Sequence, residues 1–172
     1  MATYKKGFKK QTSEQMLLQI IVGIIIAVVV FVLIAFVYDV ATRVPGYDDY
    51  GKIVKYTEIY TQEDEDENPI EKYLVYFYAD TCDGCTSIAK QVLQSANRIT
   101  KNGGTFLVAK ASAFTEGETE RDAFLTTIQR TSFSYPMLIA VVDGELAGVY
   151  IGTTAVVDTL AAVRTGTYEP FN

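Results

Sequence analysis

Residues 73–85 read YLVYFYADTCDGC, and this stretch decides the fold. Its first part, Leu74 to Ala79, is apolar or aromatic throughout, which is typical of a strand covered on both faces in the centre of an α/β sheet. Two cysteines follow, separated by an Asp-Gly dipeptide. From Thr86 to Ile99 apolar residues recur at helical spacing, and Gly103-Gly104 ends the pattern. The sequence therefore predicts a strand, a short loop with both cysteines, and a helix.

The cysteine pair has the placement that thiol–disulfide exchange needs. We expect Cys82 at or next to the N-terminus of the helix, where unpaired N–H groups and the helix dipole favour negative charge and lower the pKa of a thiol. The thiolate is the form of cysteine that attacks disulfides. Cys85, three residues on, is close enough to attack a mixed disulfide at Cys82. The spacing predicts a redox-active pair in which Cys82 and Cys85 are the catalytic residues.

Other interpretations of these residues are less favourable. A disulfide that closes so short a ring restrains the unfolded chain little. A zinc site of thiolates or imidazoles cannot be completed within one chain that has two cysteines and no histidine. Buried inert thiols fit poorly with the polar Asp83-Gly84 insert.

The acidic run Glu63–Glu67 lacks the spacing of a calcium loop and is typical of a solvated loop. We expect no metal and no organic cofactor.

Four blocks of the chain resemble the thioredoxin family, in the order that the family has them. Phe77 to Cys85 resembles its block of two aromatics, an alanine and Cys-x-x-Cys. Thr105 to Lys110 resembles the next strand, which has a lysine near its end. Ser134 to Val141 resembles the loop with a cis-proline, and Val142 to Gly152 resembles the terminal hairpin. The resemblance covers about residues 53–165 and implies an α/β, thioredoxin-like fold, with a central mixed sheet flanked by helices.

The resemblance also implies how substrates bind. The family's cis-proline loop packs against the cysteine pair and offers its backbone to a substrate chain, which binds as an extra strand. Tyr135 and Pro136 are therefore the candidate substrate-binding residues. A core tyrosine that precedes a strand is an equally open interpretation of Tyr135.

This sequence departs from the family's pattern around the cysteines. Thr81 stands where the family usually has tryptophan, and Asp83-Gly84 replaces Gly-Pro. Tyr76 occupies the position of a buried acid, and Lys110 remains without that acid as a partner. These residues are the expected neighbours of the active site. They leave two hypotheses open: an oxidoreductase whose direction, reductase or oxidase, is undetermined, and a non-catalytic interaction module in a membrane or export complex.

A second segment predicts a membrane anchor. Met16 to Val37 contains no charged residue and as a helix would be about 33 Å long, enough to cross a bilayer core. A cleaved signal peptide is disfavoured, because its apolar run is usually only about 7–15 residues long and no small-x-small cleavage site follows. Lysines precede the span at positions 5, 6, 9 and 10, whereas only Arg43 follows closely. Because positive flanks stay in the cytoplasm, the rest of the chain is expected outside.

The sequence divides into five expected segments. They are a cytoplasmic basic N-terminus (1–15), a transmembrane signal anchor (16–38), a juxtamembrane linker (39–51), a thioredoxin-like domain (52–166) and a loose C-terminal tail (167–172). Tyr47 and Tyr50 in the linker are candidates for the lipid interface, although Tyr38 is better placed.

Within the domain we expect four further elements besides those already described. They are an outer strand at Lys52–Tyr60, a helix at Glu118–Arg130, a hairpin at Met137–Ile151 and a last helix at Ala155–Arg164. The hairpin turns at Asp143-Gly144. In the helix at 118–130, Ala123, Phe124 and Ile128 are expected to face the core.

Charge and compartment limit the partners. Residues 39–172 contain 11 Lys/Arg against 20 Asp/Glu, a net charge of −9, which does not suit nucleic acid or anionic lipid surfaces. Outside the cytoplasm disulfides form and persist, so protein disulfides or dithiols are the expected substrates, with a membrane redox partner.

No Asn-x-Ser/Thr site is present, which favours a bacterial plasma membrane over a glycosylating pathway. A single uncharged span disfavours a channel or transporter subunit, and a lone Gly23 is weak support for dimerisation through the span.

Overall fold

The computed structural model describes residues 13–43 and 45–172. The chain forms two compact units, residues 1–43 and residues 44–172, each described by itself below. The lysines that were expected to set the membrane orientation, at positions 5, 6, 9 and 10, lie outside the described residues.

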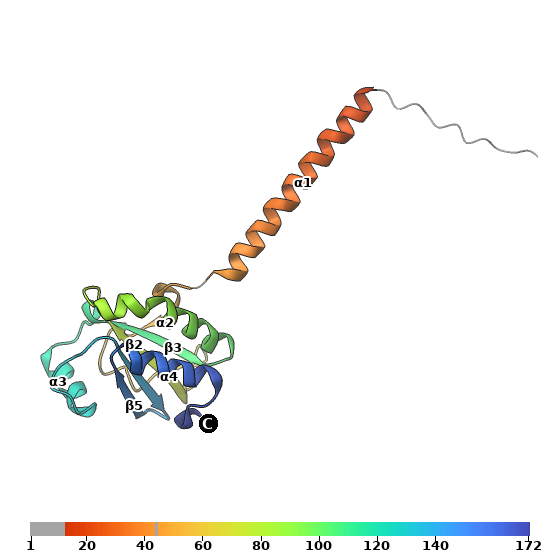
Figure 1. The fold of residues 1–172 in the computed structure, drawn as a ribbon. Coiled ribbons are helices and arrows are strands. Elements are labelled where there is room, and N and C mark those ends of the chain that lie inside the picture. The colour runs from red at the N-terminus through yellow and green to blue at the C-terminus, as the bar shows by residue number, and fades with distance from the viewer. Residues whose placement is uncertain (1–12, 44) are drawn as a thin grey trace, which may run out of the picture. The chain divides into compact units, whose positions relative to one another are not determined.

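The described part of the first unit forms the helix α1 (Ser13–Thr42), drawn in orange in Figure 1. Within it, Ser13–Tyr38 is long and apolar enough to cross a membrane, although a signal sequence has the same length and composition. Its large apolar side chains are exposed, with Phe31 at 73% of its full accessibility. A helix in the core of a soluble domain would bury such side chains.

The second unit is built on a five-stranded mixed sheet in the order β1-β3-β2-β4-β5. The strands are β1 (Gly51–Lys52), β2 (Lys72–Tyr78), β3 (Thr105–Lys110), β4 (Met137–Val142) and β5 (Glu145–Ile151). The pairs β1–β3 and β3–β2 are parallel, whereas β2–β4 and β4–β5 are antiparallel. The predicted parallel neighbours and the predicted hairpin are both present.

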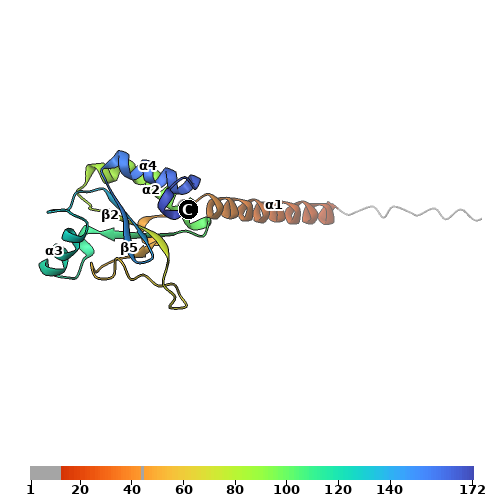
Figure 2. The ribbon, with the colours of Figure 1, turned by 90° about the horizontal axis from the view of Figure 1, so that it is seen from below.

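Helices cover both faces of this sheet. They are α2 (Asp83–Lys101), α3 (Glu118–Thr127) and α4 (Thr153–Thr165), and three short 3₁₀ helices lie at Tyr47–Asp49, Ala111–Ala113 and Glu169–Phe171. Figures 1 and 2 show α2 and α4 side by side on one face, with α3 on the other.

The side chains of β2 alternate between the two faces. Leu74 and Tyr76 belong to the apolar cluster under α2 and α4, and Tyr73, Val75 and Phe77 belong to the cluster under α3. All five are fully buried. The apolar run in the sequence is thus the central strand of a sheet covered on both faces, as expected.

The first strand is shorter than predicted. β1 ends at Lys52, and only one more ladder bond follows, from the N–H of Ile53 to the carbonyl of Val108 at 2.9 Å. Turns then bury Tyr56 and Ile59 in the cluster under α3. The prediction of a strand through Tyr60 is therefore wrong, because contacts with the core decide the conformation of these β-forming residues.

The third helix also differs in detail from the prediction. α3 ends at Thr127 rather than Arg130, and the side chains that it buries are Phe124 and Leu125. Ala123 is exposed, so its expected place in the core was wrong. Ile128, which follows the helix, is buried as predicted.

Two expectations about the ends of the domain were wrong. Tyr50 is buried in the core, and Tyr47 stacks on Tyr78 with ring centroids 4.5 Å apart, so neither ring is available to a lipid interface. The tail is not loose, because the buried Tyr168 meets the hydroxyl of Tyr150 at 2.8 Å. Aromatic side chains hold both segments by long-range contacts that local sequence patterns do not reveal.

Candidate active site

The two cysteines form a disulfide at the start of α2, with their Cα atoms 5.2 Å apart. Cys82 is the N-cap residue, and its sulfur accepts a hydrogen bond from the backbone N–H of Cys85 at 2.9 Å. Cys82 is partly exposed, whereas Cys85 is 4% exposed. Cys82 is therefore the more accessible of the two cysteines and Cys85 is covered, as a nucleophilic and a resolving cysteine require.

The loop before β4 lies against the cysteine loop. A Cβ atom added to Gly84 would be 3.1 Å from Cδ of Pro136, 3.3 Å from Cγ2 of Thr153 and 3.9 Å from the sulfur of Cys82. The Tyr135–Pro136 peptide bond is cis. The N–H of Gly152 donates to the carbonyl of Pro136 at 2.9 Å, which joins the start of β4 to the start of α4.

Strand order, helix placement and the close approach of Pro136 to Gly84 in the cysteine loop together decide the fold class. The domain has the thioredoxin fold. The cysteine loop follows the central strand, and three segments far apart in sequence meet at the disulfide: the first turn of α2, the start of β4 and the start of α4.

Comparisons with known proteins find similarity among solved structures alone. No protein-family model matches the chain, and no curated protein sequence matches it. Among solved structures, thioredoxin from Malassezia sympodialis is 13% identical over 69% of this chain and 90% of that chain, with a TM-score of 0.49. Oxidised mitochondrial thioredoxin 3 from Saccharomyces cerevisiae is 18% identical over 72% and 97%, with a TM-score of 0.47. Thioredoxin from Trypanosoma brucei brucei is 14% identical over 76% and 95%, with a TM-score of 0.48.

Tyr135 faces an aromatic cluster beside the cysteine loop. Its half-buried ring stacks on Phe133 with centroids 5.7 Å apart and planes 7° apart. Burial raises the pKa of Tyr135 to about 12, so the phenol is neutral at physiological pH. Sequence analysis missed Phe133, although its position two residues before Tyr135 in the same loop was a usable signal.

Tyr76 lies within the core at the strand position of the family's acid. Its ring is fully buried and stacks on those of Tyr47 and Tyr78, with centroids 5.7 and 5.9 Å away. Burial raises its pKa far above the ordinary value, and the neighbouring Tyr47 adds to this shift. Neither the Tyr47 nor the Tyr76 hydroxyl has a hydrogen-bond partner among residues 13–43 and 45–172. Tyr76 is therefore a neutral phenol that cannot accept a proton from a thiol near pH 7.

Lys110 has a partner that the sequence did not indicate. Its ammonium nitrogen lies 3.0 Å from a carboxylate oxygen of Asp80, two residues before Cys82. The hydrogen bond to Asp80 raises the pKa of Lys110. Both side chains reach solvent, so the pair links the end of β3 to the cysteine loop at the surface of the domain.

The remaining predicted neighbours surround Cys82. Thr81 and Asp83 are exposed beside it, and Gly84 is partly covered by Pro136. No cluster of three or more His, Cys, Asp or Glu side chains suited to a metal is found in the described part of the chain. The structure thus brings the cysteines, Gly84 and Pro136 together, and it turns Tyr135 toward Phe133.

Proposed function

We propose that this protein is a membrane-anchored, extracytoplasmic thiol–disulfide oxidoreductase that exchanges disulfides with protein substrates. One observation carries the proposal: a disulfide at a helix N-terminus whose first cysteine is partly exposed, whose second is buried, and whose loop lies against a proline loop. A disulfide in so short a ring would stabilise the fold little, so its placement fits a chemical role better than a structural one.

The proposed reaction begins with both cysteines reduced. The Cys82 thiolate attacks one sulfur of a substrate disulfide, and the other substrate sulfur leaves as a thiolate. The Cys85 thiolate then attacks the Cys82 sulfur and releases the second substrate thiol. Two electrons have passed to the substrate, and the Cys82–Cys85 disulfide has formed. As an oxidase, the protein would run these steps in reverse.

The N-terminus of α2 assists this chemistry. The N–H of Cys85 already donates to the Cys82 sulfur, and the same group would stabilise a thiolate in the reduced state. Asp83 opposes this effect, because its negative charge next to Cys82 disfavours the thiolate. The dithiol form is then less stable relative to the disulfide, and the reduction potential of the pair is lower. We therefore propose a reducing poise, which requires electrons from a dithiol partner in the membrane.

The location in the cell rests on α1. Its length, apolar composition and exposed side chains suit a single-pass anchor in a plasma membrane, with the thioredoxin-fold domain outside. The lysines before the span support a cytoplasmic N-terminus by their charge.

Trapping of mixed disulfides tests the exchange reaction. Without the resolving sulfur, the Cys85→Ser variant should accumulate covalent adducts with substrate proteins, visible as bands on non-reducing gels that disappear with dithiothreitol. The Cys82→Ser variant is the matched control and should trap nothing. If Cys85→Ser forms no adducts while the Cys82→Ser chain still binds its partners, the interaction-module hypothesis replaces the enzyme.

A further inference from the structure

Positive charge collects at the end of the domain remote from the disulfide. In a part of the chain with a net charge of −9, Lys72, Arg98, Lys101 and Arg164 lie together around the C-terminal ends of α2 and α4. We call these four residues the basic end. Cys82 caps the opposite end of α2, which has 19 residues and is therefore about 28 Å long.

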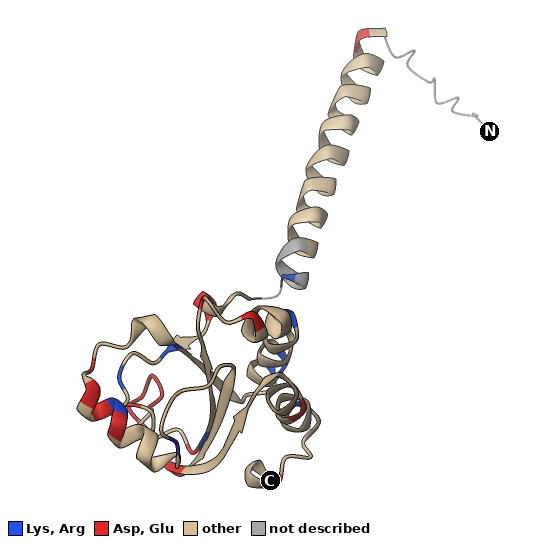
Figure 3. Ribbon diagram, turned by 60° about the vertical axis from the view of Figure 1, so that its left-hand side comes forward, with Lys and Arg blue, Asp and Glu red and all other residues tan. Residues whose placement is uncertain are grey.

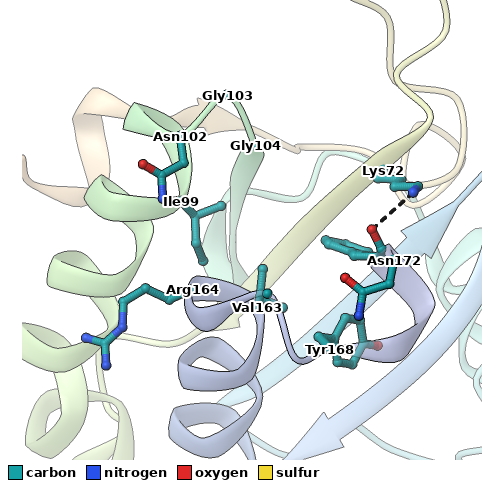
Figure 4. A pocket seen from close by; sticks show the side chains of 11 residues that line it. Lys72, Ile99, Asn102, Gly103, Gly104, Val163, Arg164, Tyr168 and Asn172 are labelled. Atoms are coloured by element: carbon teal, nitrogen blue, oxygen red, sulfur yellow. Dashed lines mark hydrogen bonds between the residues drawn. The ribbon is translucent and has the colours of Figure 1, made fainter.

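The basic end is hollowed on both sides of Arg164. One hollow of about 320 Å³ lies between the ends of the two helices and is lined by Lys72 and Arg164 over Ile99, Val163 and Tyr168 (Figure 4). A second, of about 410 Å³, is lined by Arg98, Lys101 and Arg164 together with two amide side chains. No acidic side chain lines either hollow.

The cations of the basic end lack acidic partners. Elsewhere in the domain, ion pairs use Lys52, Lys55, Lys110 and Arg121. Within the described ranges, none of the four residues of the basic end pairs with a carboxylate, and Lys72 donates instead to the carbonyl of Phe171 at 3.1 Å. Arg98, Lys101 and Arg164 also complement the dipoles of their helices, but Lys72 stands on a strand and serves no helix end.

The same domain presents the complementary charge as a folded loop. All five side chains of Glu63–Glu67 are exposed, and none forms an ion pair with a described residue. Asp64 holds the loop, because its carboxylate accepts the N–H groups of Asp66 and Asn68, both at 2.9 Å. Glu63, Glu65, Asp66 and Glu67 remain directed to solvent. Figure 3 shows acidic residues in this region and on α3.

We propose that the acidic loop of one copy of this chain docks on the basic end of a second copy. Loop and basic end do not pair within one copy in the part of the chain that the structure describes, so their charges are available to a neighbour. The contact joins two unlike surfaces and can repeat from copy to copy. Exposed ion pairs are individually weak, so the association depends on the high local concentration of anchored chains, and in this respect it rests on the proposed anchoring.

Charge exchange between the two surfaces provides the test. The full chain, carrying donor or acceptor fluorophores at the N-terminus, is reconstituted in phosphatidylcholine vesicles. Energy transfer between copies is expected at about 0.1 M salt and should fall at least about twofold at about 1 M salt, where the screening length drops from about 10 Å to about 3 Å. The variants K101E/R164E and E65K/D66K should each lose the salt-dependent transfer. Reversal of both charges needs K72E/R98E/K101E/R164E, which takes the basic end from +4 to −4, and E63K/E65K/D66K/E67K, which takes the loop from −5 to +3. Each of these two sets alone should lose the transfer, and the variant that combines them should regain it.

A matched control separates docking between copies from a general effect of net charge. K90E/R130E makes the same change in net charge as K101E/R164E, but at exposed cations outside both hollows, and should behave like wild type. The proposal is overturned if wild type shows no salt-dependent transfer or if the combined variant does not recover this transfer. It is also overturned if transfer appears only in anionic vesicles, because the basic end would then bind lipid headgroups. Flotation of the vesicles reports anchoring and mixed-disulfide trapping reports exchange, so failure of the proposed function would be seen separately.

Discussion

At the scale of single residues, Gly84 allows the proline loop to approach the cysteine loop closely. The site is narrow because only a hydrogen stands where another residue would place Cβ, against Pro136 and Thr153. A glycine inside the first turn of a helix carries an entropic cost, so its use here indicates that the close approach matters.

Substitution of Gly84 should slow exchange. In Gly84→Ala, the new methyl group meets Pro136 at 3.1 Å and Thr153 at 3.3 Å, so the loops must separate by a few tenths of an ångström. A 1 Å displacement costs roughly 100-fold in rate, so we expect a loss of about 3- to 10-fold in insulin reduction. Gly46→Ala is the control, because its nearest neighbour lies at 3.8 Å. Equal rates for both variants would show that the contact has no role in exchange.

The sequence predicted some residues of the site and not others, for a physical reason. Cys82 at a helix start follows from local patterning, since the strand, the dipeptide and the helix are contiguous. The Asp80–Lys110 pair does not, because 30 positions separate the two residues and only the parallel pairing of β2 with β3 brings them together. The resemblance indicated Pro136 beside the cysteines, but not the stacking of Tyr135 on Phe133.

At the scale of elements, continuous periodic segments were predicted well and short edge segments were not. The boundaries of β3, β4 and β5 agree with the sequence pattern, because each is a β-rich run between turn residues. β1 has two residues and the C-terminal 3₁₀ helix has three, which is too short for a periodic pattern. Their positions depend on aromatic contacts with distant strands.

The C-terminal segment should therefore contribute to stability. Tyr168 is 8% exposed, packs edge-on against Tyr150 and Phe171, and shares a hydrogen bond with Tyr150. Tyr168→Ala should lower the free energy of unfolding by about 3 kcal/mol through lost burial. Tyr168→Phe should lower it by about 1 kcal/mol through the lost hydrogen bond.

Urea unfolding of the full chain in detergent, followed by near-ultraviolet circular dichroism, measures these changes. Glu169→Ala, at an exposed neighbouring position, is the control and should stay within about 0.5 kcal/mol of wild type. A Tyr168→Ala variant as stable as the control would mean that the tail is not part of the folded domain.

At the scale of the whole molecule, the domain is built on buried tyrosines, and this makes it sensitive to alkali. Burial raises the pKa of Tyr60 to about 12 and that of Tyr76 further. Below pH 10 these phenols are neutral in both the folded and the unfolded chain, so stability is complete. Above pH 10 the unfolded chain loses protons first, because an exposed tyrosine has a pKa of about 10. The unfolded state then binds fewer protons, and the free energy of unfolding falls as pH rises until the folded-state pKa is passed.

Tyr76 tests this linkage because its ring is inaccessible to solvent. At pH 11, one unit above the unfolded pKa, a phenol that stays neutral in the folded state lowers the free energy of unfolding by about 1.4 kcal/mol. Tyr76→Phe removes this ionisation, so the loss of stability between pH 8 and pH 11 should be smaller than in wild type by about that amount. At pH 8 the variant should be at least as stable as wild type, because the hydroxyl it removes is buried without a hydrogen-bond partner among the described residues. Urea titrations at the two pH values give both quantities. Equal losses in the two proteins would mean that the Tyr76 hydroxyl reaches water in the folded state, and that the core beneath α2 is more open than its packing indicates.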